Sequence, residues 1–184
     1  MVINTPENSI LKIARAVHFA ALKHKGQRRK GEDAEPYINH LAEVSETLAL
    51  HTNGEDLNLV IAGLLHDALE DTETTYDELI ATFGHDVADL VKEVTDDKSL
   101  PKTERKRLQV ERAPHKSSRA KMIKIADKLS NLNSILNSPP KDWSPDRKRE
   151  YFEWAKRVVD GCGGINSGLD KAFVEIYAKG SALF

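Results

Sequence analysis

Residues 56–71 read Asp-Leu-Asn-Leu-Val-Ile-Ala-Gly-Leu-Leu-His-Asp-Ala-Leu-Glu-Asp, and this stretch decides the fold. Between Leu57 and Leu65 the side chains are apolar nearly all round a helix, which is the pattern of a helix buried on every side. Asp56 precedes this run and is placed to open the helix. A histidine and three acids follow at its end. We therefore predict a central, buried helix that carries ionisable side chains on its C-terminal half.

Helical signals recur along the rest of the chain, whereas a sustained alternation of polar and β-branched residues, which would indicate strands, is missing. Capping residues, glycines and prolines mark where helices begin and end. Further helices are expected over residues 5–26, 40–54, 75–84, 85–94, 103–112, 122–138, 144–161 and 168–178. The sequence predicts an all-α fold, a single helical bundle over residues 1–184.

The first helix is expected to start at Thr5-Pro6, because a capping residue followed by proline is typical of a first helical turn. Ile10, Ile13 and Val17 follow at helical spacing, with Ala20 or Ala21 next. These residues are predicted to form the stripe of the helix that faces the core.

Length and composition limit the functions open to this chain. Its 184 residues, 40% of them hydrophobic, suit one domain with its own core. A formal net charge of −2 argues against a dedicated nucleic-acid binder. Cys162 is the only cysteine, which excludes an internal disulfide framework and a thiolate zinc site. Because the N-terminus lacks a signal-peptide layout and no apolar run approaches the ~20 residues of a membrane span, a soluble, cytoplasmic protein is expected.

Four ionisable side chains, His66, Asp67, Glu70 and Asp71, lie at the end of the apolar run. Burying them without partners would be unfavourable. Residues four apart stack on one side of a helix, so the four side chains are expected to form two adjacent polar rows. A bound cation is the simplest way to stabilise such a cluster, and mixed imidazole and carboxylate ligands indicate a transition metal.

Two adjacent ligands do not complete a metal site, so others must come from elsewhere in the chain. His40 stands at the start of a helix after a basic loop, and Asp127 lies among apolar residues, an unusual place for a carboxylate. With His66 and Asp67 they would form a two-histidine, two-carboxylate site that leaves positions open for water and substrate. Taken singly, a histidine such as His40 is more often a cap or a packed residue than a ligand.

The dipeptide His-Asp also occurs at His85-Asp86, directly after Gly84. There the aspartate is expected at a helix start, where the helix dipole favours a negative charge. None of the other histidines has a comparable carboxylate neighbourhood inside an apolar run. They are expected to be surface or packing residues: His18, His24, His51, His85 and His115.

The order of His40, His66-Asp67 and Asp127 resembles the H…HD…D pattern of the HD-domain phosphohydrolases. The surrounding sequence resembles the hydrolase domain of the RelA/SpoT family and, within it, the stand-alone small alarmone hydrolases, over nearly the whole chain. The matching blocks are residues 26–30, 36–40, 65–72, 83–84, 94–98 and 126–132, extended by residues 100–106 and 151–154. Six ordered blocks rarely match by accident.

This resemblance implies a Mn²⁺-dependent 3′-pyrophosphohydrolase, which removes pyrophosphate from guanosine tetraphosphate or pentaphosphate to leave GDP or GTP. It implies that the metal ligands are His40, His66, Asp67 and Asp127. The family's paired catalytic acids correspond to Glu70 and Asp71. Its guanosine phosphate contacts correspond to Arg29, Lys30, Asn131, Arg147 and Tyr151.

Two features depart from the family pattern. Ala68-Leu69 stands where Thr-Val is usual, which leaves the spacing of the acids intact, and Glu32-Asp33-Ala34 lengthens the basic loop.

A second basic stretch runs from Lys98 to Lys124. Such a stretch could steer anions, but it is more often a solvated face, and a solvated face is expected here.

Glu70 and Asp71 lie one turn beyond the ligands, where they could orient a water molecule, accept its proton or deliver one to the leaving oxygen. Arg29 and Lys30 shortly precede His40 and would offset phosphate charge.

Two alternatives stay open: an HD phosphohydrolase acting on another nucleotide such as NADPH, and an alarmone-binding module without turnover. The length leaves no room for a synthetase domain, so a bifunctional enzyme is not expected. The oligomeric state is not predicted.

Overall fold

The structure of the protein is a computed structural model that describes residues 8–183. Over that range it consists of α-helices with one short 3₁₀ helix and contains no strand, and an isolated backbone bridge joins Arg28 to Pro36. The elements are α1 Ser9–Lys23, α2 Ile38–His51, α3 Leu57–Leu65, α4 Ala68–Asp71, α5 Tyr76–Phe83, α6 His85–Val94, α7 Lys102–Arg112, η1 Ala113–His115, α8 Ser118–Asn137, α9 Pro145–Asp160 and α10 Ser167–Ser181. The all-α prediction is confirmed.

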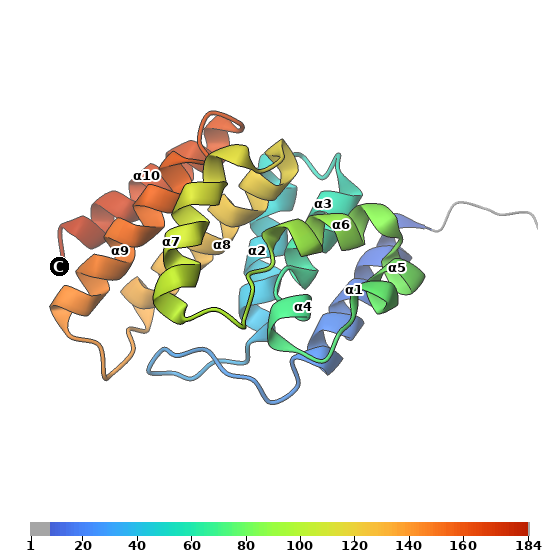
Figure 1. Ribbon diagram of the computed structural model, residues 1–184, viewed down its shortest axis with the longest axis horizontal. Coiled ribbons are helices and arrows are strands. Elements are labelled where there is room, and N and C mark those ends of the chain that lie inside the picture. Colours follow the sequence, from blue (N-terminus) through green and yellow to red (C-terminus); the bar gives the residue numbers. More distant parts are fainter. Residues whose placement is uncertain (1–7, 184) are drawn as a thin grey trace, which may run out of the picture.

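Helices α2, α3 and α8 form the centre of the molecule (Figure 1). α3 packs against α1, α2 and α6, while α8 packs against α2, α9 and α10. α1, α5 and α6 lie at one end of the view and α9 and α10 at the other, and the loop between α1 and α2 crosses its lower edge (Figure 1). Early and late parts of the chain therefore meet where α2 packs on α8.

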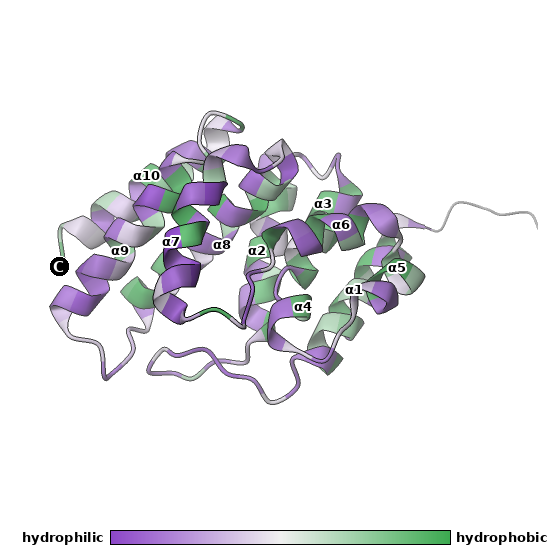
Figure 2. Cartoon of the chain, in the orientation of Figure 1, coloured by the Kyte–Doolittle hydropathy of each residue, from purple (hydrophilic) through white to green (hydrophobic). Residues whose placement is uncertain are grey.

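α3 is buried as the sequence predicted, and residues 59–65 are all shielded from solvent. Asp56 caps the helix by accepting a 2.9 Å hydrogen bond from Leu59 N. Gly63 lets α2 approach closely, because a Cβ there would lie 2.4 Å from Leu48 Cδ1. Apolar segments are visible in α1, α2 and α3, whereas α7 is mostly hydrophilic (Figure 2). None of the helices within residues 8–183 has the length and apolar content to cross a membrane.

The central helix ends earlier than predicted. α3 stops at Leu65, His66 and Asp67 form a turn, and α4 begins at Ala68. Asp67 has φ −97° and ψ 0°, which interrupts the regular helical rotation. His66 Nε2 consequently lies 3.1 Å from Asp67 Oδ2, while the acids of α4 line a neighbouring cleft. The prediction of one continuous helix through residue 71 is therefore wrong, but Asp71 N still donates a 2.8 Å hydrogen bond to Asp67 O, so these two acids lie one helical turn apart.

The stripe predicted to face the core from the first helix is wrong at Ile10, Ile13 and Val17 and right at Ala20. Ile10, Ile13 and Val17 are 76%, 38% and 44% exposed, whereas Ala16 and Ala20 are buried. α1 packs against α3 with these alanines on its buried side. Small side chains let two helix backbones approach closely, so the side of α1 that carries the alanines makes the contact.

Capping side chains mark the start of several described helices, among them α1 and α9. The predicted start at Thr5-Pro6 lies outside the described residues, and α1 begins at Ser9 with Asn8 as its N-cap. The Asn8 side chain accepts a 2.8 Å hydrogen bond from Ile10 N. Ser144 caps α9, which begins with Pro145, and its hydroxyl accepts a 3.2 Å hydrogen bond from Arg147 N.

Candidate functional site

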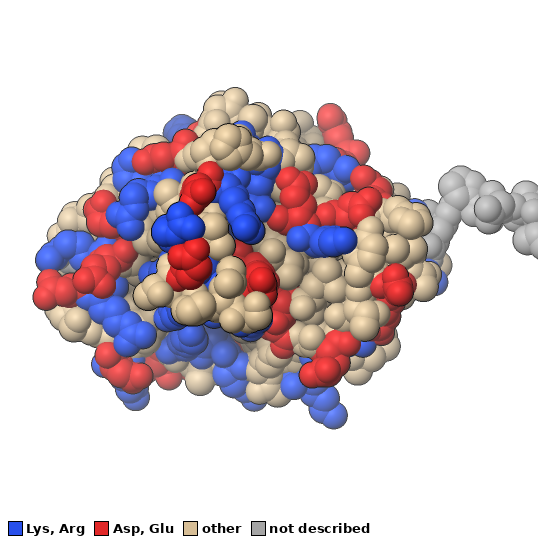
Figure 3. Space-filling view, viewed as in Figure 1, with Lys and Arg blue, Asp and Glu red and all other residues tan. Residues whose placement is uncertain are grey.

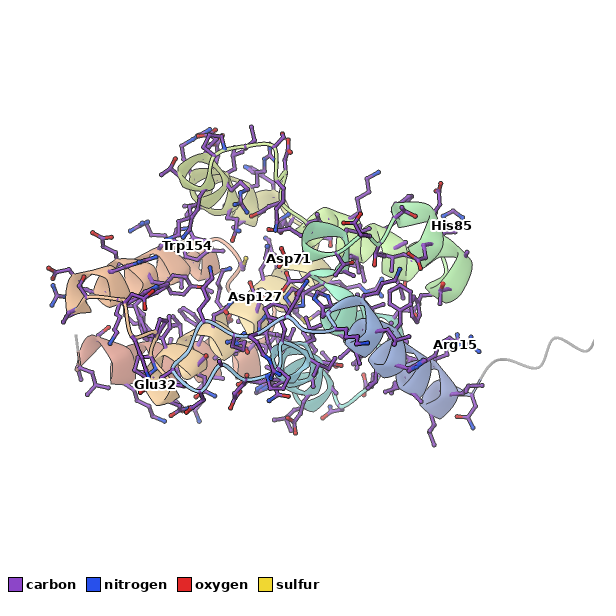
Figure 4. The ribbon with its side chains drawn as sticks, turned by 90° about the horizontal axis from the view of Figure 1, so that it is seen from below. Arg15, Glu32, Asp71, His85, Asp127 and Trp154 are labelled. Atoms are coloured by element: carbon purple, nitrogen blue, oxygen red, sulfur yellow. The ribbon has the colours of Figure 1, made fainter. Side chains whose placement is uncertain are left out.

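Three parts of the bundle bring the predicted metal ligands together. His40 comes from the first turn of α2, His66 and Asp67 from the turn after α3, and Asp127 from the middle of α8. Ligand atoms of His40, His66 and Asp67 lie within 4.8 Å of one another. Asp127 Oδ1 lies 3.5 Å from His40 Nε2 and 3.9 Å from His66 Nε2. Asp127 lies near the centre of the view in Figure 4.

A backbone contact determines which nitrogen of His66 faces the cluster. Its Nδ1 lies 2.7 Å from the carbonyl oxygen of Gly63. A carbonyl can only accept a hydrogen bond, so in the neutral ring Nδ1 carries the proton and Nε2 presents a lone pair. His66 Nε2 is buried, has no hydrogen-bond partner within the described chain, and lies 3.1 Å from Asp67 Oδ2. A cation, or a proton on Nε2, would satisfy both of these atoms.

Neighbouring donors orient the two aspartates. The hydroxyl of Tyr37 donates a 2.6 Å hydrogen bond to Asp67 Oδ2. Asp127 Oδ1 accepts a 2.5 Å hydrogen bond from Asn131 Nδ2, and its Oδ2 accepts one of 2.8 Å from Lys128 Nζ. Contacts of this kind commonly hold the carboxylate ligands of metal sites in place.

Burial and charge act in opposite directions on these groups. Burial lowers the pKa of His40. Burial also acts to lower the pKa of His66, but Asp67 and Asp127 outweigh it and raise that pKa to about 9. Burial alone would raise the pKa of Asp127, yet Lys128 and the two histidines hold it below its usual range. The carboxylates of the cluster therefore favour a positive charge close to them.

This donor set fits a divalent transition metal. Two imidazole rings and two carboxylates converge, and no thiolate takes part among the described residues. Such a set suits manganese, iron or zinc better than magnesium or calcium, which prefer oxygen ligands alone. The unpaired, buried Nε2 of His66 is the kind of atom that metal binding would satisfy.

A cavity of about 400 Å³ lies beside the cluster, and we call it the cleft. Its cationic lining residues are Arg28, Arg29, Lys30, Lys98, Lys102, Arg105 and Lys106, and its acidic ones are Glu70, Asp71 and Asp96. Lys and Arg atoms gather at the lower edge of the face in Figure 3, between α7 and the loop after α1. A cleft with this excess of cations suits a ligand that carries several negative charges.

Glu70 and Asp71 line the cleft from α4. Glu70 Oε1 lies 3.3 Å from Arg105 Nη1, and Glu70 Oε2 accepts a 3.1 Å hydrogen bond from Asp96 N. Burial raises the pKa of Glu70. Asp71 forms an ion pair with Lys98. A carboxyl group whose pKa is raised is better suited to proton exchange near neutral pH than an ordinary one.

The loop after α1 carries Arg29 and Lys30 to the cleft. Arg29 Nη2 donates a 3.3 Å hydrogen bond to the carbonyl oxygen of Ser130, whereas Lys30 is exposed. The loop also docks on the end of α8, because a Cβ at Gly31 would lie 2.4 Å from Ser138 O. The lengthened loop is therefore anchored to the helix that carries Asp127.

The other predicted substrate contacts lie in the cleft wall or against it. Asn131 and Tyr151 line the cleft, although the Asn131 amide also donates to Asp127. The ring of Tyr151 lies 5.5 Å from that of Trp143, and burial raises the pKa of Tyr151 to about 12. The guanidinium of Arg147 lies 4.6 Å over the ring of Trp143, which lines the cleft. Together they form an aromatic and cationic end to the cleft.

The start of the second basic stretch lines the cleft, although Lys98 and Lys102 are exposed, as expected of a solvated face. Lys98 precedes α7, and Arg105 and Lys106 follow Lys102 on that helix by three and four residues, so that both lie near its face. Partial burial and the nearby Lys30 lower the pKa of Lys102. Helical spacing in the sequence indicates that these cations share a face of α7. The packing of α7 on α9 decides where this face points.

The remaining histidines take no part in the cluster. His85 is exposed and far from Asp127 (Figure 4), and Asp86 in the first turn of α6 lies 2.8 Å from a guanidinium nitrogen of Arg119. His24 is buried, and its ring stacks on that of Tyr37 with centroids 5.3 Å apart. Sequence reasoning did not single out Tyr37, although it stands three residues before His40.

Known proteins show both sequence and structural similarity to this chain. Residues 16–153 match the family model described as HD domain. The chain is 51% identical over 158 residues to guanosine-3′,5′-bis(diphosphate) 3′-pyrophosphohydrolase MESH1 of Xenopus tropicalis, covering 86% of this chain and 88% of that protein. It is 50% identical over 164 residues to the protein of the same name from Homo sapiens, covering 89% and 92%.

Two solved structures share the fold. One is described as a metazoan ortholog of SpoT that hydrolyzes ppGpp, with a TM-score of 0.88, 45% identity and coverage of 91% of this chain and 94% of the other. The other is lmo0812 from Listeria monocytogenes EGD-e, with a TM-score of 0.63, 33% identity and coverage of 78% and 94%. The family model and these relatives show that the chain belongs to the HD domain family, alongside the MESH1 proteins.

Proposed function

We propose that this chain is a metal-dependent guanosine-3′,5′-bis(diphosphate) 3′-pyrophosphohydrolase, which hydrolyses (p)ppGpp to GDP or GTP and pyrophosphate. One observation carries the proposal: a cluster of imidazole and carboxylate groups lies beside a cleft with a large excess of cations. A substrate with two pyrophosphate groups matches that charge. The names of the MESH1 relatives and the solved structure of the ppGpp-hydrolysing ortholog support the same substrate.

We infer that His40, His66, Asp67 and Asp127 bind one divalent cation and that this cation is Mn²⁺. Mixed imidazole and carboxylate ligands suit manganese and related metals. A divalent cation supplies Lewis acidity, which acidifies water and neutralises charge on a phosphoryl group. The buried, unpaired Nε2 of His66 supports the assignment.

Glu70 and Asp71 are the groups proposed to move protons. Hydrolysis breaks the bond between the ribose 3′ oxygen and the first phosphorus of the 3′ pyrophosphate, and a water oxygen forms the new bond to that phosphorus. The water loses a proton, and the leaving 3′ oxygen gains one. Both carboxyls line the cleft, and the pKa of Glu70, which burial raises, suits it to this exchange.

Cations from two sides of the cleft are proposed to hold the phosphates. Arg29 and Lys30 come from the loop after α1, facing the basic side chains of α7. A polyanion between them would relieve the repulsion among these cations. Arg147 and Tyr151 would hold the base or sugar against the aromatic end of the cleft, and Asn131 would contact the substrate beside the metal.

We also infer that residues 1–184 form one catalytic domain that acts on a small-molecule substrate in the cytoplasm. The match to the HD domain model covers residues 16–153, which supports one domain. The lone Cys162 is buried and suits a reducing compartment.

Product analysis tests the proposed function. The protein is incubated with Mn²⁺ and either ppGpp or NADPH, and pyrophosphate and orthophosphate are measured separately. Release of pyrophosphate and GDP from ppGpp supports the proposal, and an Asp67→Ala variant should abolish it. Release of orthophosphate from NADPH alone would assign the site to another nucleotide. Binding of ppGpp without turnover would identify an alarmone-binding module. Repeating the assay metal by metal tests the choice of Mn²⁺.

A further inference from the structure

A chain of hydrogen bonds leads from His40 to a second surface of the molecule. His40 Nδ1 lies 2.8 Å from Ser130 Oγ, and this hydroxyl donates a 2.6 Å hydrogen bond to Glu43 Oε2. Asn133 Nδ2 donates a 3.0 Å hydrogen bond to the other oxygen, Glu43 Oε1. His40 and Ser130 are buried, whereas Glu43 and Asn133 line a small pocket between α2, α8 and α10, away from the cleft.

Helical spacing brings these residues together. His40 and Glu43 are three residues apart on α2, and Asp127 and Ser130 are three apart on α8. Residues with this separation share one face of a helix. Each helix therefore presents one proposed ligand and one supporting side chain to the other. α2 packs directly on α8, and this packing places Ser130 between His40 and Glu43.

The number of available protons sets the direction of the hydrogen bonds. An ionised carboxylate can only accept, so the single hydroxyl proton of Ser130 is used in the bond to Glu43. His40 Nδ1 must then donate to Ser130 Oγ and carry the ring proton. The lone pair on His40 Nε2 consequently faces Asp67 Oδ2 at 3.7 Å and Asp127 Oδ1 at 3.5 Å.

We propose that Ser130 and Glu43 are positioning residues that hold His40 in the tautomer whose Nε2 binds the divalent cation. This inference rests on the proposed metal site and extends it to two residues outside the ligand set. Glu43 acts through Ser130, and Asn133 keeps the Glu43 carboxylate in place. Such partners increase metal affinity because they order the ring before the cation binds.

His66 provides an internal reference for this proposal. Its Nδ1 is held by the backbone carbonyl of Gly63, which no side-chain substitution removes. The two histidines of the cluster therefore depend on different supports. Changes at Glu43 or Ser130 should alter the tautomer of His40 and leave that of His66 unchanged.

Equilibrium titration with Mn²⁺, with free Mn²⁺ followed by electron paramagnetic resonance, measures the effect on affinity. Glu43→Gln and Ser130→Ala should each weaken Mn²⁺ binding by about 10- to 100-fold. The amide replaces one carboxylate oxygen with an NH2 donor, so the positions now occupied by Oε1 and Oε2 no longer both accept, one from Asn133 and one from Ser130. Glu46→Gln, at an exposed position on the same helix, is the matched control and should bind as the wild type does.

The double variant shows whether Glu43 acts on Mn²⁺ binding through Ser130 or independently of it. If Glu43 acts through Ser130, the combined Glu43→Gln and Ser130→Ala variant should bind Mn²⁺ no more weakly than Ser130→Ala alone. Additive losses, or an affinity unchanged in both single variants, would overturn the proposal. Circular dichroism of each variant shows whether the fold is retained.

Nitrogen NMR of the metal-free protein with labelled histidine provides a second readout. The wild type should show the proton of His40 on Nδ1, and both single variants should shift it toward Nε2 while His66 stays unchanged. A wild-type His40 protonated on Nε2 alone would contradict the proposal. Neither readout uses ppGpp. If both single variants bind Mn²⁺ more weakly but the wild type releases no pyrophosphate from ppGpp, only the proposed substrate is wrong. If the wild type hydrolyses ppGpp but the variants bind Mn²⁺ as it does, only the positioning role of Glu43 and Ser130 is wrong.

Discussion

The hydroxyl of Tyr37 donates a 2.6 Å hydrogen bond to Oδ2 of Asp67, the same oxygen that lies 3.1 Å from His66 Nε2. Burial, with the charge on Asp67 in addition, raises the pKa of Tyr37, so the phenol stays protonated and can donate. Tyr37 lies directly before α2 and three residues before His40. One short segment thus supplies both a proposed ligand and the donor that orients another.

Tyr37→Phe should lower the affinity for Mn²⁺ by about tenfold, because Asp67 loses the donor that orients its carboxylate. Equilibrium titration with Mn²⁺ measures the change. The matched control is Tyr76→Phe, which removes a hydroxyl that contacts Asp89 at an exposed site. Equal losses in the two variants would show that the Tyr37 hydroxyl has no particular role at the metal site.

Glu70→Gln and Asp71→Asn should each reduce the turnover of ppGpp by about 10²- to 10⁴-fold, because an amide cannot accept or return the proton. Binding of ppGpp should change little, since Arg105 and Lys98 stay in the cleft. Steady-state rates and equilibrium dialysis separate the two quantities. Unchanged turnover in the variant that carries both substitutions would refute the proposed acid–base role.

Glu70→Gln should also stabilise the fold at neutral pH. Burial raises the folded-state pKa of Glu70, so the stability that its protonated form contributes is present at acid pH and lost as the pH rises through that pKa. The uncharged amide avoids this loss. The variant should therefore be more stable than the wild type at about pH 7, and this gain should disappear near about pH 4. Thermal unfolding across this pH range measures the difference, and a gain that is independent of pH would count against the explanation.

Binding of polyanions should weaken as the pH rises through the pKa of Lys102. Partial burial and Lys30 lower this pKa, so Lys102 loses its proton at a lower pH than an ordinary lysine does. Calorimetry with inorganic pyrophosphate should show a loss of about tenfold when this charge is absent. Lys102→Arg keeps its charge and should bind more tightly than the wild type at high pH. Lys25→Arg, at an exposed position, should show the wild-type pH dependence.

Removal of the metal should lower the thermal stability. A cation that binds only the folded state at about 100 times its Kd contributes about 2.7 kcal/mol. For a chain of this length that corresponds to a rise in Tm of about 5–10 °C, which EDTA should reverse. His66→Ala should abolish the Mn²⁺-dependent rise, while His85→Ala, at the second His-Asp dipeptide, should retain it. A full rise in the His66→Ala variant would place the cation elsewhere.

The helical class and the central helix were predictable because they depend on local patterns. An apolar run from Leu57 to Leu65 has no polar face to expose, so it must be covered by other helices. The adjacent His66 and Asp67 likewise marked one end of the cluster from sequence alone. His40 and Asp127 were also named from the sequence on weaker grounds, the resemblance to the HD family then implied all four ligands, and the structure brings these two close to the others.

The face that a helix turns inward was less predictable. In α1 the structure buries Ala16 and Ala20, while Ile10 and Val17 from the predicted stripe stay exposed. Likewise, the spacing of cations on α7 defines a face but not its direction. Only the contacts of α7 with α9 turn Lys102 and its neighbours toward the cleft.

The sequence by itself determined the all-α class, the buried α3 and the chemistry of the ionisable cluster, because periodicity and side-chain type are local properties of the chain. The tertiary structure alone decided the turn at Asp67, the cationic lining of the cleft and the contacts of Ser130 with Glu43 and His40. These features depend on how helices distant in sequence pack. A hydrogen bond between α2 and α8 exists only when packing brings donor and acceptor within about 3 Å.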